Sequence, residues 1–219
     1  CIRNIKLLSY VDYFYFPWKR YRVDVAGTSG IDGSLQLSYS YNNSLAMLIK
    51  YSIKNKAQNY IAGRNEKHVL PYLRHRLRYQ INYAFNDCNS IKFLADYTNT
   101  GYWKLDKTDG YLLSATANIG SKSFPLKASL NGAWFSTGDF NSRVYLYEPG
   151  LLYTFSMLSF YGNGIRSSVK LQYNLGKKFM VQIKGGWTHY TDRNVIGTGT
   201  EEIQGRNKAD VQMQLRLKW

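Results

Sequence analysis

The end of the chain, residues 208–219, alternates strictly between apolar and polar side chains. The apolar positions are Ala209, Val211, Met213, Leu215, Leu217 and Trp219. Because successive side chains of a β-strand point to opposite faces, this segment predicts a strand with one apolar and one polar face. A tilted strand of about 9–11 residues is long enough to cross a bilayer as part of a β-barrel. The segment therefore predicts a two-faced strand of membrane-spanning length.

The same alternation recurs along the chain, in the segments 35–41, 45–53, 77–85, 91–97, 113–119, 126–134, 169–175 and 179–187. One such run is weak evidence, but a series of them predicts an all-β protein. Residues 7–14 and 21–25 also have the composition of strands. The 20 Tyr, 10 Phe and 5 Trp residues favour strands and are typical of the aromatic girdles of membrane barrels. We expect about 12 strands, within a range of roughly 10 to 14.

The predicted connections fall into two classes that alternate in order. Short, turn-rich connections are expected at 42–44, 86–90, 120–125 and 176–178. Longer ones are expected at 55–71, 99–109, 136–142 and 191–207. Outer-membrane barrels have this arrangement, with short periplasmic turns and longer extracellular loops.

One segment, residues 143–164, does not fit the pattern. It is compatible with two short strands around a turn near Glu148–Gly150, or with one strand followed by a loop that folds inward. The sequence leaves both possibilities open.

These patterns predict one antiparallel transmembrane β-barrel over residues 1–219, in the outer membrane of a Gram-negative bacterium, with a periplasmic C-terminus. The strands of a soluble β-sandwich or a lipocalin-like barrel also alternate between apolar and polar side chains, so these folds remain alternatives. The sequence has no initiator Met and no signal peptide, so we expect it to be the C-terminal part of a longer protein.

The net charge of +15 points to anionic partners. Strand parity predicts that six basic residues face the lumen: Lys50, Arg76, Arg78, Lys170, Lys184 and Arg216. A cationic lumen with walls of low dielectric constant would concentrate anions. We therefore expect a porin-like channel or transport component, with outer-membrane lipid and lipopolysaccharide as its surroundings. Alternatively, a plug closes the lumen, or the protein is a non-conducting scaffold subunit of an assembly, secretion or DNA-uptake machine that binds protein partners.

The densest basic stretch is Arg74–Arg78. It superficially resembles a nucleic-acid patch. Strand alternation places His75 on the opposite face from the three arginines, so lipopolysaccharide phosphate explains the stretch at least as well, and nucleic acid is the weaker expectation.

Enzyme motifs such as GxSxG, HExxH, the P-loop and CxxC are absent from the sequence. Cys1 and Cys88 form neither a disulfide framework nor a metal-ligand cluster. We expect no enzymatic activity, no cofactor and no metal.

Two resemblances add to this interpretation. An alternating final strand that ends in an aromatic residue resembles the signal read by the barrel-assembly machinery, which would make Leu215, Leu217 and Trp219 the signal residues. A second resemblance rests on several short motifs: Phe16–Trp18, Tyr21–Val23, Ser142–Glu148, Phe160–Arg166, Ile196–Gly199, Glu202–Ile203 with Gly205, and Gln214–Trp219. With these motifs the chain resembles the barrel region of a Bacteroidota family of predicted outer-membrane proteins, whose members often carry a helix-hairpin-helix, ComEA-like segment ahead of the barrel. That resemblance implies an outer-membrane location and no particular activity.

Overall fold

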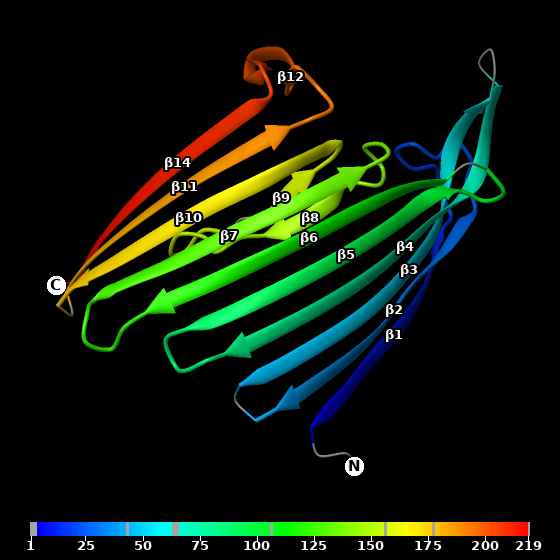
Figure 1. Cartoon of the computed structure of the whole chain (residues 1–219). Helices are drawn as coiled ribbons and strands as arrows, with labels where there is room; N and C mark the ends of the chain where they lie inside the picture. The colour runs from blue at the N-terminus through cyan, green and yellow to red at the C-terminus, as the bar shows by residue number, and fades with distance from the viewer. Residues whose placement is uncertain are drawn as a thin grey trace.

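A large antiparallel sheet dominates the computed structural model, which describes residues 4–42, 44–62, 66–105, 107–155, 157–176 and 178–218. Ten strands form this sheet in the order β1-β2-β3-β4-β5-β6-β7-β10-β11-β14, and all neighbours are antiparallel (Figure 1). The prediction of an all-β, antiparallel protein is confirmed. Its strands are β1 (Ile5–Phe16), β2 (Thr28–Tyr41), β3 (Leu45–Ala62), β4 (Glu66–Ala84), β5 (Ser90–Tyr102), β6 (Lys107–Gly120), β7 (Leu126–Thr137), β10 (Asn163–Leu175), β11 (Phe179–Tyr190) and β14 (Asn207–Leu217).

Two small hairpins accompany the sheet. One pairs β8 (Val144–Tyr147) with β9 (Met157–Phe160), and the other pairs β12 (Val195–Ile196) with β13 (Ile203–Gln204) around the short 3-10 helix η1 (Gly199–Glu201). Among the described residues, no helix is both long and apolar enough to span a membrane.

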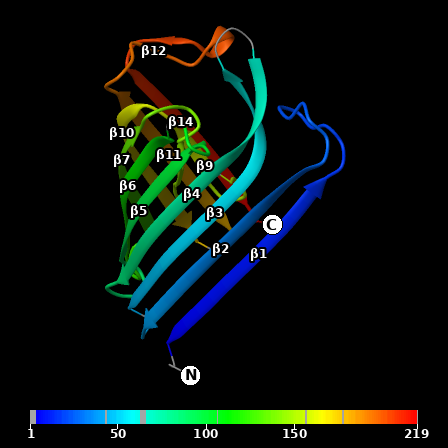
Figure 2. The same cartoon turned by 90° about the vertical axis from the view of Figure 1, so that its right-hand side faces the viewer.

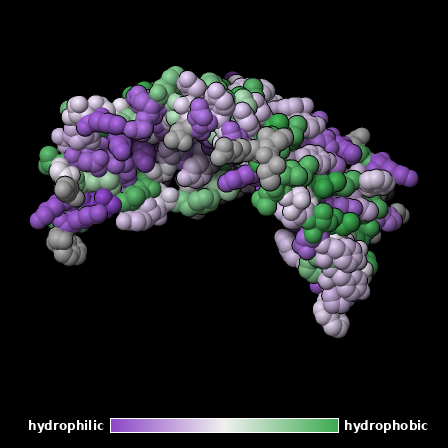
Figure 3. All heavy atoms as spheres, turned by 90° about the horizontal axis from the view of Figure 1, so that it is seen from below, coloured by the Kyte–Doolittle hydropathy of each residue, from purple (hydrophilic) through white to green (hydrophobic). Residues whose placement is uncertain are grey.

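The large sheet is bent into an arch, which is seen from its side in Figure 2 and from below in Figure 3. In the described structure β1 pairs only with β2, and β14 pairs only with β11. The two edge strands are not hydrogen-bonded to each other, so the arch is open. Its short connections and its C-terminal end lie along one edge (Figure 1).

The strand registers gather the apolar side chains on the convex face. Tyr79, Ala95, Leu113, Trp134 and Ile165 follow one another across five neighbouring strands. Leu113 is 54% exposed and Trp134 is 45% exposed, although both are large and apolar. A shift of one residue in any register would turn these side chains to the other face. The convex face is therefore an extended apolar surface that nothing covers in the described structure.

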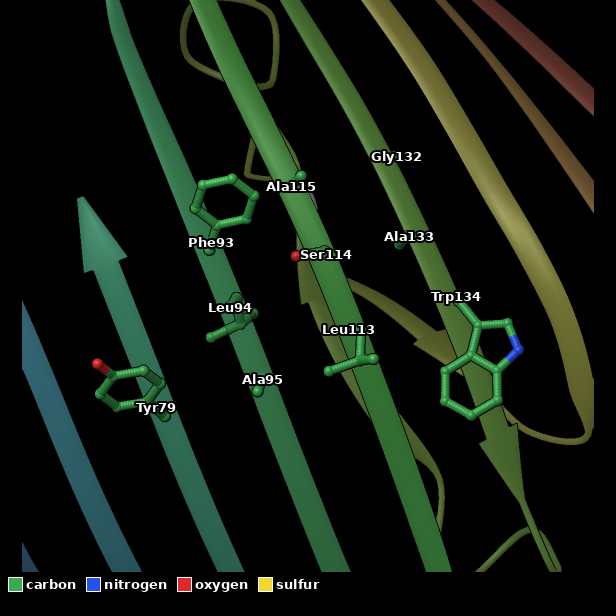
Figure 4. A pocket seen from close by; sticks show the side chains of 10 residues that line it. All are labelled: Tyr79, Phe93, Leu94, Ala95, Leu113, Ser114, Ala115, Gly132, Ala133 and Trp134. Carbon is green, nitrogen blue, oxygen red and sulfur yellow. The ribbon is translucent and has the colours of Figure 1, made fainter. Parts of the chain in front are cut away.

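A shallow apolar depression lies in the middle of this convex surface (Figure 4). The side chains of Tyr79, Phe93 and Trp134 surround the small residues Ala115 and Gly132, and the depression has a volume of about 430 Å³. Small residues between aromatic rings leave the backbone of β5, β6 and β7 close to the surface.

The expected loops at 55–71 and 99–109 are largely wrong, because the strands continue through them. β3 runs to Ala62 and β4 starts at Glu66, while β5 runs to Tyr102 and β6 starts at Lys107. Polar side chains at these strand ends suggested loops, but the ladder of backbone hydrogen bonds does not depend on side-chain polarity. The strand expected at 21–25 is also absent; an isolated bridge joins Arg20 and Val23 there.

The structure also resolves the ambiguous segment between β7 and β10. Residues 138–162, called the insert below, fold over the concave face and carry the β8–β9 hairpin. Phe160 of the hairpin stacks on Phe135 of β7, with ring centroids 4.6 Å apart. Phe135 and Leu112 are fully buried beneath it. The buried hydrophobic cluster thus lies between the concave face and the insert, which folds inward and contains two short strands.

Candidate functional site

The strand registers place the predicted lumen cations on the concave face. Arg78 lies opposite Lys50 on β3 and opposite Asp96 on β5. Lys170 and Lys184 lie opposite each other on β10 and β11. Three of these cations, Lys50, Arg76 and Arg78, together line a cavity of about 90 Å³.

One buried carboxylate lies between two of the arginines. The Arg76 Nε donates to Asp96 Oδ1 at 2.9 Å, and the Arg78 Nε donates to Asp96 Oδ2 at 3.0 Å. The side chain of Asp96 has no exposed surface. Two guanidinium groups thus share a single carboxylate, and Lys50 lines the adjacent cavity with them, so positive charge is in excess at this part of the concave face.

A second, more deeply buried cluster joins the insert to the sheet. Glu148 of the insert accepts a hydrogen bond from Arg166 Nε at 2.8 Å and lies 3.0 Å from the Nζ of Lys184. Arg166 also donates to Asp210 on β14 and to the hydroxyl of Thr188. Glu148 has no exposed surface, and Arg166 is 3% exposed. Two cations and two carboxylates balance one another here, so this cluster is a closed ion-pair network.

A glycine makes room for this network. A Cβ atom on Gly186 would collide with the guanidinium group of Arg166, whereas a Cβ atom on the neighbouring Gly185 would meet nothing. Gly186 faces the concave side and Gly185 faces the convex side. The missing side chain of Gly186 therefore allows Arg166 to lie flat on β11.

The middle of the insert is attached to the sheet through its backbone. The N–H of Leu152 donates to Gln182 Oε1 at 2.7 Å, and its carbonyl oxygen accepts from Gln214 Nε2 at 2.9 Å. Gln182 in turn donates to Gln172 at 2.6 Å. Together with Glu148, these bonds hold the insert against β10, β11 and β14.

The start of the insert is a turn organised by Asp139. Its Oδ1 accepts hydrogen bonds from the backbone N–H groups of Asn141 and Ser142 and from the hydroxyl of Thr108, each at 2.9 Å. Burial by itself raises the pKa of the Asp139 carboxyl, but these hydrogen bonds outweigh it and hold the pKa below its usual value. Asp139 is therefore ionised at neutral pH and fixes where the insert leaves β7.

Lys50, Lys170 and Arg216 differ from the other three predicted cations, because none of them forms an ion pair within the described residues. Lys170 lies opposite Lys184, whose charge Glu148 neutralises. Arg216 lies opposite Met180, six residues along β14 from Asp210, and its Nε is buried without a hydrogen-bond partner in the described part of the chain.

Sequence reasoning missed Asp96, Glu148, Arg166 and Asp210. Strand parity could have found Asp96, because it lies between the outward-facing Ala95 and Tyr97. It could also have found Arg166, had the strand been extended back from Val169 to Asn163. No local signal could pair Glu148 with Arg166, because the insert joins the sheet through tertiary contacts and not through a strand ladder.

Two predicted assembly-signal residues, Leu215 and Leu217, are exposed on the convex side of β14, at 58% and 63%. The third, Trp219, lies outside the described residues.

Within the described residues, no group of three or more His, Cys, Asp or Glu side chains could hold a metal ion. No family model, no curated protein and no solved structure matches this chain.

Proposed function

We propose that this chain forms the wall of an outer-membrane β-barrel and acts as a channel or transport component with a basic inner face. The observation that carries the proposal is the separation of the two faces of the sheet. A soluble β-sandwich buries the apolar face of each sheet against a second layer. Here the buried cluster is on the polar, concave side, and the apolar convex side is exposed. Lipid chains are the surroundings in which such a convex surface is stable.

Strand length supports the same proposal. The ten strands of the large sheet have between 11 and 19 residues, and about 9–11 tilted residues cross a bilayer. Unpaired backbone groups are costly in a bilayer. The proposal therefore requires that β1 and β14 are hydrogen-bonded in the membrane, either to each other or to further strands.

The charges of the concave face support an anion pathway. Lys50, Lys170 and Arg216 have no carboxylate partner among the described residues, and Asp96 neutralises only one of its two arginines. Fixed positive charge on a water-filled inner wall raises the local concentration of anions. The insert narrows this pathway on the side of β10, β11 and β14.

Single-channel recording in a planar bilayer under a salt gradient tests the proposal. We expect a steady conductance with a reversal potential that indicates anion preference. Changing both Lys50 and Lys170 to Gln should reduce that preference. Lys122→Gln is the matched control, because Lys122 is 76% exposed and lies in the β6–β7 connection. Cation preference, or an anion preference that the double variant leaves unchanged, would contradict a pathway along the concave face.

A second candidate function is a non-conducting scaffold subunit of an outer-membrane machine. The specific observation in its favour is the insert, which lies over the concave face and is held there by the buried Glu148 network. A protein that inserts into the bilayer but stays electrically silent, both as the natural chain and as Glu148→Gln, would favour the scaffold. The similarity of several motifs to a Bacteroidota outer-membrane family is compatible with both candidates and remains a prediction.

A further inference from the structure

A basic pocket lies apart from the Asp96 and Glu148 networks. It has a volume of about 180 Å³ and lies between β3, β4, the start of the insert and the β1–β2 connection. Its cationic lining residues are Arg22, Lys54, Lys56, Arg74 and Arg143. Segments far apart in the sequence therefore bring basic groups together around one small space.

Most of this positive charge is not neutralised by carboxylates of the described residues. Lys54 pairs with Asp32 on β2. Arg22, Lys56, Arg74 and Arg143 form no ion pair with a carboxylate in the described part of the chain. The nearby carboxylate of Asp139 is occupied by the hydrogen bonds of its own turn. Like charges that are gathered without counter-charges repel one another, so a bound anion would stabilise this arrangement.

Other contacts hold the side chain of Arg143 and the backbone of Arg22 in position. The Nε of Arg143 donates to the hydroxyl of Tyr145 at 2.7 Å, and its Nη1 donates to the carbonyl oxygen of Phe140 at 3.0 Å. Arg22 has a backbone φ of 62°, in the left-handed region, and its carbonyl oxygen accepts from the N–H of Asn59 on β3 at 2.9 Å. The Arg143 guanidinium and the backbone that carries Arg22 are therefore in place before any ligand binds, which lowers the entropic cost of binding.

Arg74 supplies a donor that no other described residue uses. Its Nη2 atom is buried and has no hydrogen-bond partner among the described residues. Buried polar groups in proteins are nearly always hydrogen-bonded, so an unused buried donor in a basic pocket indicates an acceptor from outside the chain. Tyr72, Gln58 and Asn141 also line the pocket and add polar side chains that can donate hydrogen bonds.

From this geometry we infer that the pocket binds a phosphoryl group, carried either by a free phosphate-bearing solute or by the headgroup of a phosphorylated glycolipid. Guanidinium groups match phosphate oxygens with paired donors, and lysine ammonium groups add point charge. The inference goes beyond the proposed channel or scaffold function, because binding at equilibrium does not require conduction.

Titration of the full chain in detergent micelles tests the inference. One arm adds inorganic phosphate. A second arm adds micelles that contain lipid A, and a third adds the same lipid after removal of its phosphates. We expect saturable binding in the first or second arm and none in the third. Binding of free phosphate identifies a solute site, whereas binding of phosphorylated lipid alone identifies a headgroup site.

Variants locate the binding to the pocket. Arg74→Gln and Arg143→Gln should each weaken binding roughly tenfold or more, because each removes a charge-assisted contact. Arg143 lies in the insert and outside the ten-stranded sheet, so its variant keeps the test available if Arg74→Gln does not fold. Lys122→Gln, in the exposed β6–β7 connection, should bind like the natural chain. Absence of saturable binding in the first two arms, or equal binding by both arginine variants, would overturn the inference.

Discussion

At the scale of single residues, the two adjacent glycines of β11 offer a matched comparison. A methyl group on Gly186 would collide with the Arg166 guanidinium, while one on Gly185 would point into open space on the convex face. We expect Gly186→Ala to lower the free energy of unfolding by about 1–3 kcal/mol, because overpacking displaces Arg166 from its partners. Gly185→Ala should be neutral or stabilising by up to about 1 kcal/mol, because alanine loses less entropy in a strand. Urea unfolding in detergent measures both. Equal effects of the two substitutions would show that the position of Arg166 does not depend on Gly186.

At the scale of elements, the attachment of the insert depends on Glu148. Glu148→Gln leaves Arg166 and Lys184 buried with one carboxylate, that of Asp210. We expect the free energy of unfolding to fall by about 3–5 kcal/mol and proteolysis within the insert to become faster. Adding Lys184→Gln restores the charge balance. The double variant should therefore lose less free energy of unfolding than the two single variants lose together. Asp87→Asn is the control, because its ion pair with Lys122 is mostly exposed and is worth about 0–1 kcal/mol. An insert that remains equally protected in Glu148→Gln would indicate that its hydrophobic contacts hold it without the ion pairs.

At the scale of the whole molecule, the convex face distinguishes a membrane protein from a soluble one. Leu113 lies in the middle of β6 and Ile119 near its end, and they are similarly exposed, at 54% and 51%. In a bilayer, Leu113→Arg should lower the free energy of unfolding by about 2–4 kcal/mol and Ile119→Arg by about 0–1 kcal/mol. The difference arises because the cost of a charged side chain depends on its depth in the bilayer. Reversible unfolding from lipid vesicles measures the difference. Similar small costs at both positions would mean that the convex face is in contact with water, which would contradict the proposed location.

The two-faced strands followed from the sequence alone. Alternation is a local property, because a strand repeats its side-chain direction every two residues. It therefore predicts β14 and most of the other strands, and it places Lys50, Arg76 and Arg78 on polar faces. The strand register of the structure then brings Arg78 opposite Lys50. Alternation failed where strands continue through polar residues, as at the end of β3 and the beginning of β4. Backbone hydrogen bonds pair the strands there, and side-chain hydropathy does not reveal them.

The tertiary structure decided what occupies the concave face. The pairing of Glu148 with Arg166 and the pocket around Arg74 both depend on the path of the insert across a curved sheet. That path is set by contacts between segments that are not neighbours in any strand ladder, such as Phe160 on Phe135. Periodicity predicts which face of a strand a side chain occupies. The curvature of the sheet and the path of the insert determine which other side chains it contacts on that face.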